Sequence, residues 1–259
     1  MEPPIPSVFY TVLLFIGMLV APAVGRRLAA RQARGRPEGE RDNLDTIETA
    51  IFALFGLLIA FTFSGAAMRF QEKRMLVAEE ANAIGTAYLR VDLVAAEAQP
   101  AIRERFRQYA DSRIETYRRL PDIKAAGVEM TKSKALQDEI WTSAIAAVRL
   151  PDSHPSSGIL LLPALNSMID ITTVRTLSFQ NHPPRVVYFL LFVLGLLCSF
   201  LAGYRVTGRA HRSWLHMAGF ALVTVVVVYV TLDLEYPRVG LIQLDRADQL
   251  LVEVREQMR

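Results

Sequence analysis

The polar side chains that could do chemistry are few, and their spacing is helical. Glu79, Asn82, Thr86 and Arg90 are separated by steps of three, four and four residues, so they share one face of a helix. Such a stripe has two interpretations. It is the solvated face of an amphipathic helix, or it is a polar lining that faces an ion path or a partner subunit.

A second polar group combines an amide with a carboxylate. Asn166 and Asp170 are one helical turn apart, with Leu165, Met168 and Ile169 around them. The two side chains therefore share a face in an apolar part of the sequence. A capping or interface hydrogen bond explains them as well as a functional site does.

A third group of polar residues lies at the end of the last apolar run of the chain. Asp233 and Glu235 end this run, and Arg238 follows. A carboxylate near the hydrocarbon of a membrane is costly unless it is paired. We expect Asp233 to pair with Arg238, although a charge at the membrane edge would give the same pattern.

Motifs for catalysis and metal binding are missing from the sequence. It has no phosphate-binding loop, no dinucleotide-binding glycine fingerprint and no nucleophile elbow. The single cysteine, Cys198, excludes an intrachain disulfide and a thiolate-rich metal site. The net charge of +3 is too small to indicate nucleic acid. We therefore expect no enzyme, no cofactor, no metal and no nucleic-acid partner. Four scattered histidines lack ligand spacing: His154, His182, His211 and His216.

The elements that must position these residues are dominated by four apolar runs. The 259 residues are 52% hydrophobic, and the apolar residues are concentrated rather than periodic. Each run is long enough to cross a hydrocarbon core of about 30 Å as a helix. We predict an all-α fold, a four-span transmembrane helical bundle with an extramembrane helical domain inserted between spans 2 and 3. The predicted spans are residues 8–25, 46–68, 185–204 and 214–234.

The first run also resembles a secretory signal peptide. Ala21, Pro22 and Ala23 imitate a cleavage site after an apolar core. Signal peptides begin with positive charge, whereas the residues before this run carry Glu2 and no basic side chain. The sequence favours a retained membrane helix.

The basic residues between the spans predict the orientation of the chain. Residues 26–43 form an Arg-rich loop, and the loop between the last two spans holds Arg205, Arg209 and Arg212. The positive-inside rule places both loops in the cytoplasm and residues 69–184 outside. Arg69 and Lys73, directly after the second span, weigh the other way.

Outside the spans, the sequence predicts amphipathic helices. Residues 69–184 contain helical apolar faces that must be buried against each other or against other subunits. One face consists of Ile102, Phe106, Ala110, Ile114 and Tyr117, and another consists of Leu136, Ile140 and Ala144. Residues 238–259 form a C-terminal amphipathic helix, whose apolar seam favours a helical partner. Its members are Leu244, Ala247, Leu251, Val254 and Met258. Three spans also carry small residues at steps of four, which favours close helix packing. They are Gly17-Ala21-Gly25, Gly56-Ala60-Ser64 and Gly195-Ser199-Gly203.

Several strings resemble the bestrophin-like family of bacterial integral membrane proteins. The most specific is EANAIGTAYLR, from Glu80 to Arg90, and the resemblance covers roughly residues 8 to 256. AFTFSG from Ala60, Leu165-Asn166 with Asp170 and Arg175, and LDLEYPR from Leu232 with Gly240 agree with it. The family-motif positions that the resemblance carries over are Glu80, Asn82, Gly85, Thr86, Tyr88, Arg90, Asn166, Asp170, Asp233, Pro237 and Arg238.

The resemblance implies a multi-pass protein of a bacterial inner membrane, distantly related to bestrophin anion channels. Those channels are ring-shaped homopentamers with the pore along their second helix. In them the segment between helices two and three is cytosolic, opposite to the orientation that the charge count predicts. The resemblance assigns no catalytic or ion-ligand role to its motif residues.

From these observations we predict an oligomeric, bestrophin-like channel for small ions, with anions favoured. Its partners would be the lipid bilayer and further copies of the chain. Phe52, Phe55, Ile59 and Thr62 follow steps of three, four and three, so they would face the axis of a ring as a constriction that gates by dewetting. A lipid-facing stripe explains the same residues. The alternative function is a non-conducting membrane sensor or assembly protein that binds a partner through its helical domain.

Overall fold

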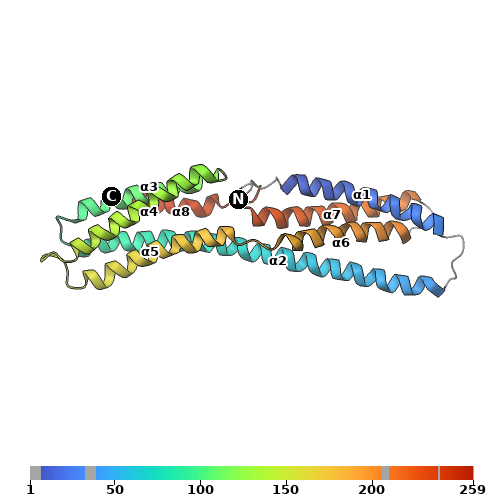
Figure 1. The fold of residues 1–259 in the computed structure, drawn as a ribbon, viewed down its shortest axis with the longest axis horizontal. Helices are drawn as coiled ribbons and strands as arrows, with labels where there is room; N and C mark the ends of the chain where they lie inside the picture. The colour runs from blue at the N-terminus through green and yellow to red at the C-terminus, as the bar shows by residue number, and fades with distance from the viewer. Residues whose placement is uncertain (1–6, 33–38, 206–209, 239, 259) are drawn as a thin grey trace. The chain divides into compact units, whose positions relative to one another are not determined.

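The computed structural model describes residues 7–32, 39–205, 210–238 and 240–258. These residues form α-helices and one short 3-10 helix, η1, and contain no strand, which confirms the all-α prediction (Figure 1). The helices are α1 (Ser7–Gln32), α2 (Gly39–Leu89), η1 (Arg90–Leu93), α3 (Gln99–Arg118), α4 (Ile123–Ala147), α5 (Ser157–Gln180), α6 (Arg185–Arg205), α7 (Ala210–Glu235) and α8 (Asp245–Gln257).

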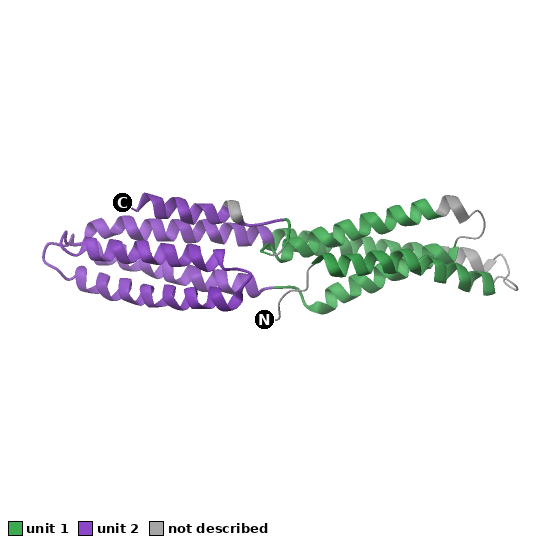
Figure 2. Ribbon diagram, turned by 90° about the horizontal axis from the view of Figure 1, so that it is seen from above, with its two compact units in different colours: residues 1–69, 182–241 green, residues 70–181, 242–259 purple. Residues whose placement is uncertain are grey.

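The chain divides into two compact units, which Figure 2 shows in different colours. Unit 1 comprises residues 1–69 and 182–241, and unit 2 comprises residues 70–181 and 242–259. Among the described residues, four helical segments are long and apolar enough to cross a membrane. They are Ser7–Arg31, Thr46–Leu93, Ser157–Arg205 and Trp214–Glu235. The apolar runs of the sequence within them lie in α1, in the first half of α2, in α6 and in α7, so unit 1 is the four-span membrane bundle and unit 2 is the helical domain.

The predicted Arg-rich loop is shorter than expected. Of residues 26–43, α1 continues to Gln32 and α2 begins at Gly39, because arginine, alanine and glutamine are good helix formers. The remaining residues, 33–38, lie outside the described part of the chain.

In unit 1, α1 and α6 approach each other through their small residues. A Cβ atom on Gly203 would overlap the backbone of Pro22, and one on Gly25 would lie 2.8 Å from the Tyr204 nitrogen. One on Gly17 would lie 2.7 Å from Leu196 Cδ2. The backbones of α1 and α6 therefore approach closely around Gly25 and Gly203, as membrane helices do where no side chain separates them.

The core of unit 1 is formed by side chains from all four of its helices. Its buried residues are Leu14, Met18, Phe55, Leu191, Cys198, Ala221, Val228 and Leu232. Many large apolar side chains on the same helices stay exposed. Such an apolar exterior is suited to contact with the hydrocarbon tails of lipids.

The helix α2 is too long for the membrane alone. Its 51 residues extend about 76 Å at the helical rise, whereas a hydrocarbon core is about 30 Å thick. The residues after Arg69 belong to unit 2, where the apolar side of α2 is buried. A single helix thus supplies both a membrane span and part of the extramembrane core.

The core of unit 2 joins α2, η1, α3, α4 and α5. The apolar faces predicted for this region are the faces that pack: Ile102 and Phe106 of α3 and Ile140 of α4 are fully buried. Asp122 begins α4 by accepting hydrogen bonds from the backbone nitrogens of Lys124 and Ala125. This capping satisfies nitrogens that would otherwise lack an intrahelical partner.

The C-terminal helix, α8, packs against other helices of its own chain. Leu251 and Met258 are buried in the core of unit 2, and Val254 packs against that core. Arg255 donates from Nε to Asp111 Oδ1 of α3 at 2.8 Å. The apolar seam of residues 238–259 therefore completes unit 2.

Candidate functional site

A network of buried charges lies at the centre of unit 2, around Glu80 of α2. Both Glu80 oxygens accept hydrogen bonds from helices distant in sequence. Arg113 Nε of α3 donates to Oε1 at 2.6 Å, and the Tyr117 hydroxyl donates to Oε2 at 3.1 Å. Arg175 Nη1 of α5 also donates to Oε2. Glu80, Arg113 and Arg175 are each at most 3% exposed.

Tyr117 lies between the two guanidinium groups. It follows Arg113 by one turn of α3, and Arg113 Nη2 donates to its hydroxyl. The guanidinium carbon of Arg175 lies 3.8 Å from the centre of the Tyr117 ring. The ring of Tyr117 thus stacks on the guanidinium group of Arg175, and its hydroxyl accepts a hydrogen bond from Arg113. The tyrosine therefore lies between two like charges and contacts both.

The network balances its charges with a residue of α8. Arg175 Nη2 lies 3.8 Å from Asp248 Oδ1, so two carboxylates oppose two guanidinium groups. Burial alone would raise the pKa of Glu80, but the positive charges of Arg113 and Arg175 outweigh it and lower this pKa. Burial, followed by the charge of Glu80, raises the pKa of Tyr117 to about 12.

These values indicate what the network can do. Glu80 stays ionised and Tyr117 stays protonated near neutral pH, so neither is poised to exchange protons there. The cluster ties α2, α3 and α5 together by charge-assisted hydrogen bonds, and the ion pair between Arg175 and Asp248 adds α8. The network therefore holds helices together and does not carry out acid–base chemistry.

Sequence reasoning singled out Glu80 but missed Arg113 and Tyr117 as its partners. A signal was present, because Arg113 falls three residues after Ala110 on the predicted apolar face of its helix. A charged residue on such a face requires a buried partner. The sequence does not say which residue that partner is.

The predicted polar stripe beside Glu80 faces away from this network. Glu79, Asn82 and Thr86 are exposed within the chain. Arg90 begins η1 and is half-buried, and its Nη1 donates to the Leu160 carbonyl at 2.6 Å, which joins η1 to α5. Glu80 and this stripe are therefore on separate faces of one helix.

The pair Asn166 and Asp170 is a local contact of α5. Asn166 Nδ2 donates to Asp170 Oδ2 at 3.0 Å, and both side chains are exposed. Their apolar neighbours Leu165 and Met168 point into the core instead. The apolar surroundings that the sequence suggested for this pair are therefore on another face of the helix.

A second buried carboxylate lies in unit 1, at the end of α7. Glu235 is fully buried and accepts from Arg69 Nε of α2 at 2.7 Å. His182 Nδ1 lies 3.5 Å from its other oxygen, and the His182 ring stacks on Tyr236 at 4.7 Å. The pairing with Arg69 offsets the cost of a carboxylate at this position.

Asp233 is held by the loop that follows α7. Its Oδ1 accepts from the Leu241 nitrogen at 3.2 Å. A Cβ atom on Gly240 would overlap the Asp233 carboxylate, so this loop can pass here only with glycine. Arg238 is half-buried in the same loop, and its expected pairing with Asp233 stays a prediction.

The stripe predicted to line a pore lies against the helices of its own chain. Phe55 is 3% exposed, and its Cζ lies 3.3 Å from where a Cβ would stand on Gly195 of α6. Phe52 and Ile59 pack partly against the same core. Thr62 donates its hydroxyl to the Leu58 carbonyl at 2.8 Å. Within one chain Phe55 therefore faces α6, and its place in a pore constriction stays a prediction.

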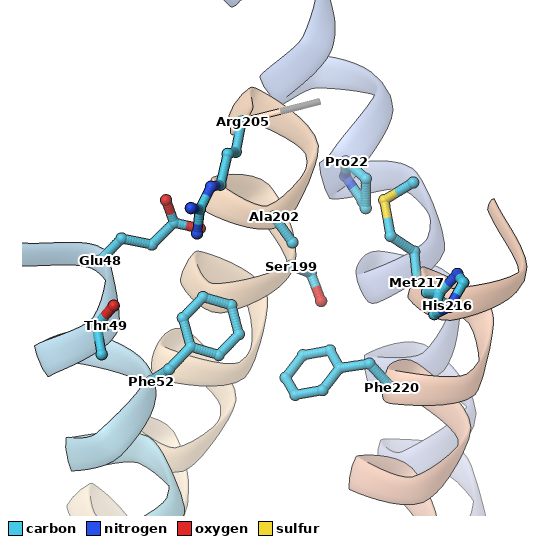
Figure 3. Close-up of a pocket in the computed structure, with 10 residues that line it drawn as sticks. All are labelled: Pro22, Glu48, Thr49, Phe52, Ser199, Ala202, Arg205, His216, Met217 and Phe220. Atoms are coloured by element: carbon cyan, nitrogen blue, oxygen red, sulfur yellow. The ribbon is translucent and has the colours of Figure 1, made fainter. Parts of the chain in front are cut away.

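A cavity of about 490 Å³ lies in unit 1, between α1, α2, α6 and α7. Figure 3 shows Glu48 and Arg205 pointing toward each other beside it, with the rings of Phe52 and Phe220 deeper in. The centres of these two rings are 5.6 Å apart. Its lining residues are Pro22, Glu48, Thr49, Phe52, Ser199, Ala202, Arg205, His216, Met217 and Phe220.

A metal site is not apparent in the part of the chain that the structure describes. Those residues contain no group of three or more histidine, cysteine, aspartate or glutamate side chains that could hold an ion. Cys198 is buried in the core of unit 1.

Comparisons with known proteins agree with the membrane fold. A family model described as the bestrophin-like domain matches residues 5–248. A solved structure described as the crystal structure of a membrane protein superposes with a TM-score of 0.69 at 13% sequence identity, covering 97% of each chain. Among curated proteins, none matches the chain. The structural likeness shows a shared fold.

Proposed function

Because the chain belongs to the bestrophin-like family of membrane proteins, we propose that it is an oligomeric, non-enzymatic channel for small ions, with anions favoured. By analogy with bestrophin channels the oligomer has five copies. The observation that carries the proposal is a face of α2 that the described helices of the chain leave uncovered. The membrane of residence, on the same analogy, is the bacterial inner membrane.

The uncovered face lies in the membrane-spanning half of α2. In the most apolar 18-residue stretch of this helix 11% of the residues are buried, against 28% in that of α1 and 22% in that of α7. A Cβ atom on Gly56 would meet no atom of the described residues within 4 Å, and Ala60 and Ser64 are exposed. Steps of four residues put these three on one side of the helix.

Small residues on an uncovered side suit contact between copies. They let backbones approach closely, as the corresponding residues of α1 and α6 do within one chain. In a ring of copies, the face with Gly56, Ala60 and Ser64 would meet a neighbouring copy or the axis. We expect this face, rather than the Phe55 stripe, to enclose the ion path.

Positive charge at one end of the spans supports anions as the conducted species. Arg26, Arg27 and Arg31 end α1, and Arg205 ends α6 at the same end of the bundle. Rings of arginine side chains at a pore mouth favour anions over cations.

The test is chloride flux through the purified protein in liposomes. We expect the wild type to pass chloride, and Gly56→Leu to reduce the flux because it blocks the close approach of α2. Gly219→Leu is the matched control, since a Cβ atom on Gly219 of α7 would likewise meet no described atom within 4 Å. Well-folded oligomers that pass no ion would contradict the proposal.

The alternative, a non-conducting sensor or assembly protein, draws support from unit 2. Large apolar side chains are exposed there, including Val128 at 69% and Ile159 at 77%. Crosslinking of the protein in its membrane separates the two functions. A symmetric ring of one chain favours the channel, whereas a monomer or a complex with another protein favours the alternative.

A further inference from the structure

The turn between α3 and α4 exposes basic and apolar side chains side by side. Ile123, the first residue of α4, is 45% exposed. We call this surface the turn patch. It consists of Arg118, Arg119, Pro121, Ile123 and Lys124, which are all exposed. Arginine and lysine beside exposed apolar residues are typical of protein surfaces that bind membranes.

The turn patch is positively charged. Residues 118–124 contain three basic side chains and one acidic side chain, Asp122. Asp122 accepts hydrogen bonds from the backbone nitrogens of Lys124 and Ala125, so its carboxylate is used to cap α4. Arg119 forms an exposed ion pair with Glu115, and such pairs contribute little to stability. The patch therefore attracts anionic partners, whereas the turn patches of two copies would repel each other.

The turn patch lies at the end of unit 2 where α2 enters this unit. In unit 2, α3 runs antiparallel to α2, because the Tyr88 ring contacts Phe106 whereas Glu80 accepts from the Tyr117 hydroxyl. Moving forward along α3 to the turn is therefore moving backward along α2. Figure 1 shows this turn at the opposite end of α4 from the loop that leads to α5.

Distances along the helices place the turn patch close to a membrane surface. Glu80 follows Met68, the last residue of the uncharged run of α2, by twelve residues, about 18 Å at the helical rise. Pro121 follows Tyr117, which bonds Glu80, by four residues, about 6 Å in the opposite direction. The turn is thus about 12 Å beyond the hydrocarbon end of α2. The headgroup layer covers about 5–8 Å of this distance. Extended arginine and lysine side chains span the rest.

We propose that the turn patch docks on the membrane surface and binds anionic phospholipid headgroups. Arg118, Arg119 and Lys124 contact the lipid phosphates, with the planar guanidinium groups able to form two parallel hydrogen bonds. Pro121 and Ile123 lie against the headgroup layer. This contact holds the hairpin of α3 and α4 to the bilayer in addition to its connection through α2. The proposal is independent of ion conduction, and it requires only anionic lipid in the leaflet beside unit 2.

The experiment measures how close the turn patch lies to lipid headgroups. Full-length Ile123→Cys is labelled with a small fluorophore, which the buried Cys198 does not take up, and is placed in phosphatidylcholine nanodiscs. These contain a lipid with a quenching nitroxide on its headgroup. We expect stronger quenching when part of the phosphatidylcholine is replaced by phosphatidylglycerol. Equal quenching with and without phosphatidylglycerol would overturn the proposal.

A label at Ile159→Cys is the control for position. Ile159 is also an exposed isoleucine, but it lies near the start of α5, at the other end of α4 from the turn. Its fluorescence should not respond to phosphatidylglycerol. If the label at Ile123→Cys responds only to the number of protein copies in each nanodisc, the patch binds a second copy and the proposal is wrong.

Removal of charge tests whether the basic side chains cause the docking. Each basic residue near an anionic surface favours the docked state about fivefold, so Arg118→Gln with Lys124→Gln should lower the ratio of docked to undocked protein about thirtyfold. The quenching by headgroup nitroxide should fall accordingly.

Lys134→Gln with Arg149→Gln is the matched control for charge. It also removes one lysine and one arginine, both exposed, from positions further along α4 or beyond its end. This variant should keep the quenching of the wild-type patch. If the two double variants lower the quenching equally, the overall charge of unit 2 attracts the lipid and the proposed patch is wrong. Size-exclusion chromatography and thermal melting check that each variant is folded.

Discussion

Glu80 and Arg113 are joined at 2.6 Å between Oε1 and Nε although 33 residues separate them in the chain. Each is on a different helix, and each is buried. The pair is extended by Tyr117 and Arg175, so a single carboxylate organises three helices of unit 2. The family motif that begins at Glu80 therefore has a structural explanation in this chain.

Replacing Glu80 should destabilise unit 2. In Glu80→Gln the carboxylate is lost while two guanidinium groups remain buried, which costs about 3–5 kcal/mol of unfolding free energy. Trp141 reports on this unit once Trp214, the other tryptophan, is replaced by phenylalanine. Glu79→Gln, which changes the exposed neighbour, is the control. Equal denaturation midpoints for the two variants would show that the network contributes little.

The lowered pKa of Glu80 should make unit 2 sensitive to acid. Since its native pKa lies below the ordinary value of 4.5, the unfolded chain binds the proton more readily than the folded one. The stability from the ionised carboxylate is complete above about pH 4.5 and is lost as the pH falls through the native pKa. Trp141 fluorescence should show a steeper loss in the wild type than in Glu80→Gln. Parallel curves would contradict this.

Close packing of α1 on α6 should not tolerate a side chain on Gly203. A Cβ atom there would overlap the backbone of Pro22, so Gly203→Leu should separate the two helices and destabilise unit 1 by about 1–3 kcal/mol or more. The thermal midpoint in detergent measures the change. Gly219→Leu, at a position with open space, should have little effect. A normal midpoint for Gly203→Leu would mean that α1 and α6 are further apart.

Replacing Phe55 should lower the stability of unit 1 rather than change the gating of an ion path. Because it is 3% exposed inside unit 1, Phe55→Ala should leave a cavity and cost about 3–5 kcal/mol. Phe61, which is 67% exposed on the same helix, is the control, and Phe61→Ala should be nearly neutral. If Phe55→Ala instead keeps full stability and raises ion flux, the constriction predicted from the sequence is correct.

Orientation in the membrane follows from cysteine labelling. The single native cysteine is buried, so it gives little background. On the positive-inside rule we expect an impermeant maleimide to label Asp152→Cys of unit 2 in intact cells and not Arg27→Cys. Labelling of Arg27→Cys alone would establish the opposite orientation, which the resemblance to bestrophin channels implies.

The sequence by itself determined where the helices lie and which regions belong to the membrane. Hydropathy is a local property, so four apolar runs identify the spans without knowledge of their neighbours. Helical periodicity likewise identified the buried faces of α3 and α4, since each face is fixed by 3.6 residues per turn.

Only the tertiary structure decided which helix faces pack against each other. The partners of Glu80 lie on α3 and α5, α8 packs on the core of unit 2, and Phe55 packs on α6. The cavity between α1, α2, α6 and α7 cannot be predicted from the sequence of any one of these helices. Such contacts depend on the volumes and charges of side chains far apart in sequence, and these meet only when the helices pack.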